Sequence, residues 1–133
     1  MRFAYLASLI AAVTFAIAAC GGDDEEGAAT GATCPEGSSL TYDNFAVGFF
    51  TTYCTVCHSS DLEGLDRHGA PSDHNFDSLE GIMDEAEHIE FEAAAGPDSV
   101  NTAMPPEDDA VNDVPSEEER FDLGEWLACG APN

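Results

Sequence analysis

Apolar residues recur at helical spacing in three segments of this chain, and no segment alternates convincingly with the period of two expected of a half-buried strand. Thr41, Asp77 and Ser116 are suitable N-cap residues at the starts of the three segments, and Gly96 follows the end of the second. The predicted helices cover residues 41–54, 78–95 and 116–129. The pattern therefore predicts an all-α domain with three main helices and long loops.

The N-terminal residues have a different composition. One basic residue, Arg2, precedes an uncharged apolar run over residues 3–19, which is typical of an export signal peptide. The tetrapeptide that closes this run at Cys20 resembles the lipobox of bacterial lipoproteins, in which the cysteine carries the lipid and becomes the mature N-terminus. Two alternatives stay open: an ordinary cleaved signal with Cys20 merely nearby, and an uncleaved anchor helix.

An acidic and glycine-rich stretch, residues 20–33, follows the signal. It is too polar to bury a face, so it predicts a flexible tether. Residues 34–133 then form a single domain with one core. A lipoprotein of this kind is expected to be membrane-anchored and to face the periplasm or the cell surface of a bacterium.

Cys54, Cys57 and His58 form a Cys-x-x-Cys-His motif, the attachment signature of a c-type haem. In a helical turn the two sulfurs project to one side, and the imidazole of His58 becomes the proximal iron ligand. A zinc site would need a second pair of ligands, and the other histidines fit no such spacing. A thioredoxin-like dithiol would need a strand-helix-strand pattern, which is absent. The motif therefore predicts one covalent haem c.

The long loop before the third helix contains Met104, Pro105 and Pro106. We expect Met104 to be the sixth iron ligand, because a thioether suits a low-spin haem that transfers electrons. The prolines restrict the backbone and support the loop without a helix. The alternative is a methionine that only packs, as we expect of Met83 in the second helix. Three further histidines are expected at the surface or in loops: His68, His74 and His88.

The cysteine count predicts a disulfide. With Cys20 assigned to the lipid and Cys54 and Cys57 to the haem, Cys34 and Cys129 remain of the five cysteines. An even remainder in an exported chain favours a bond between them. Two buried free thiols are the alternative.

Two further residues are candidates for support of the haem pocket. Arg67 is expected either to pair with a haem propionate or to be simply exposed. Trp126 is expected to anchor the core against the first helix rather than to take part in redox chemistry.

These residues resemble the class I cytochrome c family, specifically its small acidic monohaem bacterial lipoproteins, over most of the chain after the tether. In that family an aromatic residue stands four positions before the first haem cysteine, as Phe50 does here. It packs on a Leu-x-x-aromatic-Leu stretch of the last helix, which Leu123, Trp126 and Leu127 match. The family usually places glycine four positions before that aromatic residue, where this chain has Ala46.

The resemblance also implies roles and a function. It implies that the carbonyl of Pro71 accepts a hydrogen bond from His58, which would fix the tautomer and basicity of the imidazole. It implies the cytochrome c fold and one-electron transfer without catalysis. Two alternatives stay open: a haem-based sensing module with an open or labile sixth position, and a haem subunit of a larger redox complex.

The charge restricts the partners. The chain has 27 acidic residues against 3 lysine and arginine residues, for a formal net charge of −24. This excludes binding to nucleic acid and adsorption on anionic lipid. It predicts a redox protein partner with a basic docking patch, because opposite potentials accelerate encounter. The alternative is that the charge serves only solubility.

Overall fold

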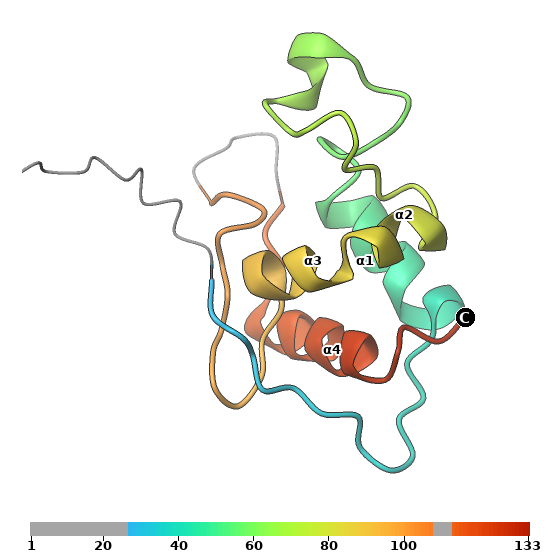
Figure 1. The fold of residues 1–133 in the computed structure, drawn as a ribbon, viewed down its shortest axis with the longest axis vertical. Helices are drawn as coiled ribbons and strands as arrows, with labels where there is room; N and C mark the ends of the chain where they lie inside the picture. Colours follow the sequence, from blue (N-terminus) through green and yellow to red (C-terminus); the bar gives the residue numbers. More distant parts are fainter. Residues whose placement is uncertain (1–26, 108–112) are drawn as a thin grey trace, which may run out of the picture.

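Short helices connected by long loops make up the fold (Figure 1). The computed structural model describes residues 27–107 and 113–133. Their helical elements are η1 (Tyr42–Ala46), α1 (Val47–Tyr53), η2 (Gly64–Arg67), α2 (Leu79–Asp84), α3 (Ala86–Ala93) and α4 (Glu117–Ala128). These described ranges contain no strand, only an isolated bridge between Ala95 and Val100. None of the helices in this part of the chain has the length and hydrophobicity of a membrane span. The predicted all-α class is confirmed for this part of the chain.

The π-helical turn η1 and α1 together form the first predicted helix. Thr41 is its N-cap, as predicted. Thr41 Oγ1 accepts a hydrogen bond of 3.2 Å from the Asn44 amide, and Asn44 Oδ1 accepts one of 2.8 Å from the Thr41 amide. This reciprocal pair satisfies two amides that a first turn leaves without partners.

The second predicted helix is wrong in its start and in its continuity. Its N-cap is Ser78, whose Oγ accepts a hydrogen bond of 3.2 Å from the Gly81 amide. Asp77 instead accepts a hydrogen bond of 2.6 Å from the Ser60 amide, so its carboxylate holds the preceding loop. The helix also divides into α2 and α3, because Glu85 has φ −114° and ψ 16° and interrupts the hydrogen-bond ladder.

The third predicted helix is confirmed as α4. Ser116 and Glu119 form the expected capping box, with hydrogen bonds of 3.3 Å from the Glu119 amide to Ser116 Oγ and 2.8 Å from the Ser116 amide to Glu119 Oε2. Cys129 is the C-cap.

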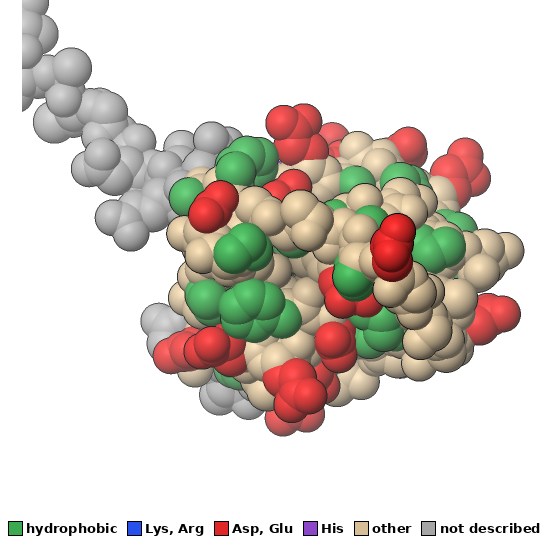
Figure 2. All heavy atoms as spheres, turned by 90° about the horizontal axis from the view of Figure 1, so that it is seen from below, with side chains coloured by type: hydrophobic (Ala, Val, Ile, Leu, Met, Phe, Trp, Pro, Cys, Tyr) green, Lys and Arg blue, Asp and Glu red, His purple; other side chains and the backbone are tan. Residues whose placement is uncertain are grey.

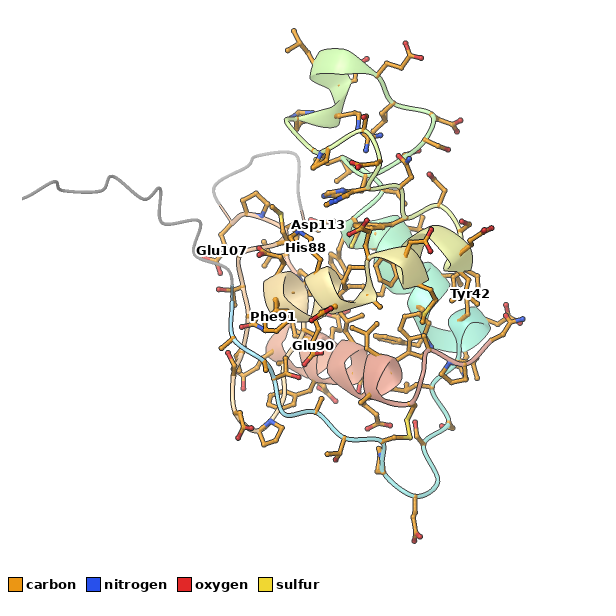
Figure 3. The ribbon with its side chains drawn as sticks, in the orientation of Figure 1. Tyr42, His88, Glu90, Phe91, Glu107 and Asp113 are labelled. Carbon is orange, nitrogen blue, oxygen red and sulfur yellow. A yellow bond between two sulfur atoms is a disulfide. The ribbon has the colours of Figure 1, made fainter. Side chains whose placement is uncertain are left out.

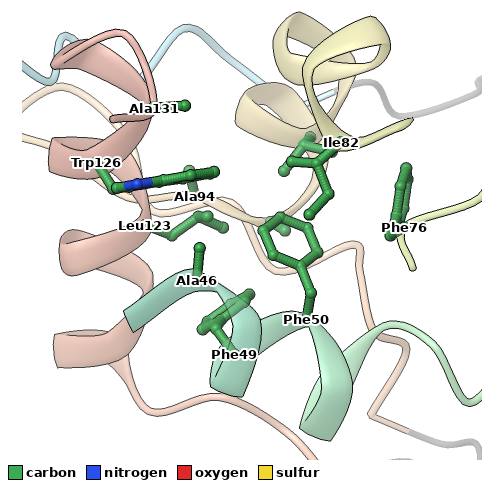
Figure 4. Close-up of a cluster of buried hydrophobic side chains, with 11 residues drawn as sticks. Ala46, Phe49, Phe50, Phe76, Ile82, Ala94, Leu123, Trp126 and Ala131 are labelled. Carbon is green, nitrogen blue, oxygen red and sulfur yellow. The ribbon is translucent and has the colours of Figure 1, made fainter. Parts of the chain in front are cut away.

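The core lies between α1, α4 and the α2–α3 pair (Figure 4). Trp126 and Leu123 of α4 and Ala46 of η1 are fully buried, and Phe50 is almost so. The ring centroids of Phe50 and Trp126 lie 6.2 Å apart in an edge-to-face contact. Burying each large side chain contributes about 1.5–3 kcal/mol. Trp126 anchors the core against α1, as expected.

Residues 27–33, which we call the N-terminal strap, pack against the domain. Thr30 is fully buried, and its amide and Oγ1 donate hydrogen bonds of 3.1 Å and 2.8 Å to Glu90 Oε1. Gly31 has a φ of +66°, and a Cβ at this position would collide with the Asp98 carboxylate. The prediction of a flexible tether is wrong for the strap, because its glycines permit close packing.

A disulfide joins Cys34 to Cys129, whose Cα atoms lie 4.6 Å apart across 95 residues of sequence. This is the pair that the cysteine count predicts, and it fastens the segment before η1 to the end of α4. The C-terminal residues also fold back, because the Pro132 carbonyl accepts a 3.2 Å hydrogen bond from Trp126 Nε1. The predicted signal peptide and the predicted anchor Cys20 lie outside the described residues.

Candidate cofactor site

A mainly apolar cavity of about 310 Å³ brings together Cys54, Cys57, His58 and Met104. Its volume is in the range of small-molecule and cofactor sites. The other lining residues come from α1, the loop that contains η2, α3, and the prolines after Met104: Phe50, Tyr53, His68, Gly69, Ala70, Pro71, His74, Phe76, His88, Ile89, Glu92, Ala93, Pro105 and Pro106. Every residue predicted to attach or ligate the haem therefore lines one cavity.

The Cys-x-x-Cys-His motif forms a turn that continues from α1. The Cys54 amide donates to the Phe50 carbonyl at 2.9 Å, and the amides of Cys57 and His58 donate to the Cys54 carbonyl at 3.1 Å and 2.9 Å. Both cysteines are half-buried, and neither forms a disulfide. Burial raises the pKa of the Cys54 thiol to about 12, although the charge of Arg120 acts in the opposite direction. Cys54 is therefore a neutral thiol at pH 7.

The environment of His58 favours a neutral imidazole. Burial lowers the pKa of His58, and its ring stacks on Phe76 with centroids 4.7 Å apart. Nδ1 lies 3.3 Å from the carbonyl oxygen of His74. Because a carbonyl only accepts, we assign the proton to Nδ1, which leaves the lone pair on Nε2. A neutral imidazole with this tautomer can ligate a metal through Nε2.

The carbonyl that contacts His58 is not that of Pro71, so the role implied for Pro71 needs correction. The Pro71 carbonyl accepts hydrogen bonds from Arg67 Nη2 and from the His74 amide. A carbonyl oxygen has two lone pairs, and both are engaged within the loop. Pro71 still lines the cavity, and the carbonyl that lies near His58 Nδ1 is that of His74.

Arg67 is only 5% exposed and lies inside the loop that contains η2. Its side chain donates five hydrogen bonds. Nε donates to the Ala70 carbonyl at 3.2 Å, and Nη1 donates to the Ser59 carbonyl at 2.6 Å and to Asn75 Oδ1 at 2.9 Å. Nη2 donates to the Pro71 carbonyl and, at 2.9 Å, to the His74 carbonyl. All five N–H groups of the guanidinium are thus in use. The expectation of an exposed Arg67 side chain is wrong, and in this arrangement the loop itself engages every N–H group that a haem propionate would need.

Met104 is fixed through its backbone, while 41% of the residue stays exposed. Its amide donates to the Glu92 carbonyl at 2.9 Å, and its carbonyl accepts a 2.8 Å hydrogen bond from Arg120 Nη1. The following Pro105 is buried, and the peptide bond between the two residues is cis. Met83, expected to pack in the core, is instead 41% exposed on α2 and does not line the cavity.

Arg120 is the functional candidate that the sequence analysis missed. It is 2% exposed, and its Nη1 donates hydrogen bonds of 2.8–3.0 Å to the carbonyls of Ala93, Asn101 and Met104. Its Nη2 is a buried donor with no acceptor among the described residues. Burial lowers the pKa of this guanidinium. The available signal was its position three residues before Leu123, on the apolar face of the predicted helix.

The other histidines surround the same cavity. His68 and His74 lie in loops, as expected, and His88 lies on α3 (Figure 3). The His74 ring stacks on His58 with centroids 6.3 Å apart and meets His88 edge-on at 5.3 Å. One wall of the cavity is therefore rich in imidazole.

The described surface has no exposed lysine or arginine. Arg67 and Arg120 are buried, and the chain's only other cation of this kind, Arg2, lies outside the described residues. Figure 2 shows acidic side chains spread over the face in view and no basic ones. The exposed charge from Asp, Glu, Lys and Arg in this part of the chain is therefore entirely negative.

Comparison with protein families, curated proteins and solved structures finds no match to this chain. Among residues 27–107 and 113–133, no group of three or more His, Cys, Asp or Glu side chains is arranged to hold a metal ion.

Proposed function

We propose that this chain is a one-electron carrier with a cytochrome c fold, which holds one haem c through Cys54 and Cys57. In this proposal His58 and Met104 would ligate its iron. The observation that carries it is the shared cavity, because residues distant in sequence converge there with the donor set of a c-type haem. The bound haem would supply an iron that accepts and donates one electron.

The protein's own residues fit this role. The mainly apolar lining suits the apolar faces of a porphyrin, and His58 presents Nε2 because Nδ1 faces the His74 carbonyl. As a soft, neutral ligand, the thioether of Met104 would favour the reduced state of the iron. Arg120 supports the site from behind, because its Nη1 binds the carbonyls of Ala93 and Met104, two residues that line the cavity.

The charge of the chain supports a protein partner rather than a nucleic acid. The part of the surface that the structure describes carries acidic side chains and no exposed lysine or arginine, so it repels phosphate and attracts a basic docking patch. In this proposal the partner is a redox protein, and the lipid on Cys20 keeps the carrier at the outside of a bacterial membrane. We propose no catalytic residue.

The test is the absorption spectrum of protein produced together with a haem-attachment system. Wild type should carry haem that denaturation does not release, and its ferric form should have the weak red band of thioether ligation. Met104→Ala should lose that band. Met83→Ala is the matched control, because Met83 is equally exposed but lies outside the cavity, and it should retain the band. Absence of covalent haem in wild type would refute the proposal.

A second candidate function is a haem-based sensor of a small ligand. The position of Met104 in a segment without regular secondary structure favours it, because a ligand carried by a loop is easier to displace than one carried by a helix. Carbon monoxide separates the two functions: a carrier with a stable Met104 bond ignores the gas, whereas a sensor binds it in the ferrous state.

A further inference from the structure

We propose that Arg67 sets the electron-donating strength of the His58 imidazole through a carbonyl oxygen that both side chains share. This inference rests on the proposed function, because it concerns His58 as an iron ligand. Arg67 is a positioning residue in this proposal, since it acts only through the His74 carbonyl.

The shared acceptor is the carbonyl oxygen of His74. It lies 3.3 Å from His58 Nδ1 and 2.9 Å from Arg67 Nη2. One oxygen has two lone pairs, so it can accept from both groups at once. The two donors therefore compete for the electron density of a single carbonyl.

The guanidinium that competes with His58 is held firmly. Arg67 is 5% exposed, and the same Nη2 also binds the Pro71 carbonyl. None of its five hydrogen-bond acceptors is a carboxylate. Its positive charge therefore acts on neutral carbonyls within a buried loop, where a charge is screened less than at the surface.

This arrangement weakens the bond from His58 to its acceptor. A strong acceptor at Nδ1 makes an imidazole more basic and a better donor to a metal. The cationic second donor draws electron density from the His74 carbonyl and makes it a poorer acceptor. A less basic His58 then stabilises ferric iron less, so Arg67 raises the reduction potential.

The test compares wild type with Arg67→Gln in the haem-loaded protein, by redox titration and by NMR of the His58 Nδ1 proton in the ferrous state. Removing the charge should make the His74 carbonyl a stronger acceptor. We expect the proton signal to move downfield and the ferric state to gain about tenfold, ~59 mV for a one-electron couple. Simple loosening of the loop would weaken the bond and move the signal upfield, so an upfield or unchanged signal overturns the inference.

Asn75→Ala is the matched control. It removes one acceptor of Arg67 but keeps the charge and the bond to His74. Its potential and proton signal should stay at the wild-type values, and a shift equal to that of the glutamine variant would overturn the inference.

A third variant covers the case in which Arg67→Gln does not fold, and the wild type separates this inference from the proposed function. If Arg67→Gln does not fold, Arg67→Lys replaces it, because one ammonium group cannot bind all five acceptors. The lysine variant should move both readouts in the same direction by less, and wild-type values would overturn the inference. Wild type without covalent haem would refute the proposed function as well, whereas a haem-loaded protein with an unchanged Arg67→Gln signal overturns only this inference.

Discussion

The guanidinium of Arg120 donates a hydrogen bond of 2.8 Å to the carbonyl oxygen of Met104. The same nitrogen binds the carbonyls of Ala93 and Asn101, so one buried side chain of α4 joins the end of α3 to the loop that contains Met104. This explains how a loop without regular secondary structure can present a thioether at the cavity.

Replacement of Arg120 by glutamine should therefore release the Met104 loop. The shorter side chain leaves buried carbonyls without donors, at about 1–3 kcal/mol each, so we expect unfolding to become easier by more than about 3 kcal/mol. The red band of the haem-loaded protein should disappear at lower denaturant concentration than in wild type. Glu118→Gln on the exposed face of α4 is the control, and equal stability of the two variants would contradict this account.

A second prediction concerns the hydrogen bond of 2.8 Å from Tyr53 Oη to Glu119 Oε1, which joins α1 to α4. Tyr53→Phe should cost about 1 kcal/mol at pH 7 in urea unfolding. Hydrogen bonds from Ser116 and Tyr53 lower the pKa of Glu119, and the bond to Glu119 raises the pKa of Tyr53.

The pH dependence of this hydrogen bond follows from the lowered pKa of Glu119 and the raised pKa of Tyr53. The Glu119 contribution is present above its ordinary pKa of 4.5 and is lost as the pH falls through the lower folded pKa. The Tyr53 contribution is present below its ordinary pKa of 10.0 and is lost as the pH rises through the higher folded pKa. The difference between wild type and Tyr53→Phe should therefore shrink at both extremes, and a constant difference would contradict the assignment.

A third prediction concerns the reactivity of Cys54 before haem is attached. Burial raises its pKa to about 12, so its thiolate fraction at pH 8 is at least about a hundredfold below that of an ordinary thiol of pKa near 8.5. Timed alkylation of a Cys57→Ser variant, followed by peptide mapping, should find Cys54 correspondingly slow. The same variant in denaturant is the reference, and equal rates in the two conditions would refute the prediction.

The helix starts at Thr41 and Ser116 were predictable because their capping boxes are local in sequence. The Cys-x-x-Cys-His motif was equally local. The N-cap at Ser78 was missed because Asp77 is an equally good N-cap by sequence. In the fold the Asp77 carboxylate instead accepts a hydrogen bond from the amide of Ser60, which is distant in sequence. Local patterns identify candidates, while contacts across the fold decide between them.

The two buried arginines, Arg67 and Arg120, also show where prediction from local sequence patterns ends. Spacing places Arg120 on the apolar face of its helix. Burial of a cation also depends on which carbonyls the folded loops direct toward it, and sequence spacing does not give that. Arg67 donates hydrogen bonds to carbonyls of a loop that has no periodic pattern. Arg120 donates to carbonyls of α3 and of the Met104 segment. The order of the N-terminal strap was missed for a related reason, since glycine content alone does not distinguish flexibility from close approach.

A fourth prediction concerns the disulfide between Cys34 and Cys129, which spans 95 residues. Closing a loop of this length restricts the unfolded chain, so the double variant Cys34→Ala/Cys129→Ala should lose about 4 kcal/mol of stability. Urea unfolding with and without reductant measures this. Reductant should destabilise wild type and leave the double variant unchanged, and insensitivity of wild type would refute the stabilising role.

The last prediction follows from a surface on which Arg67 and Arg120 are buried and every exposed Asp, Glu, Lys or Arg charge of the described part is acidic. Electron exchange with a cationic reagent, hexaammineruthenium, should slow by about tenfold or more as salt increases, because the attraction is screened beyond about 10 Å at 0.1 M. Exchange with the anionic reagent hexacyanoferrate should become faster over the same range, because salt screens a repulsion. Stopped-flow rates with both reagents measure the effect, and the anionic one controls for changes in the haem site itself. Rates independent of salt would mean that electrons leave through a region that the acidic field does not reach, and the expectation of a basic docking partner would then be wrong.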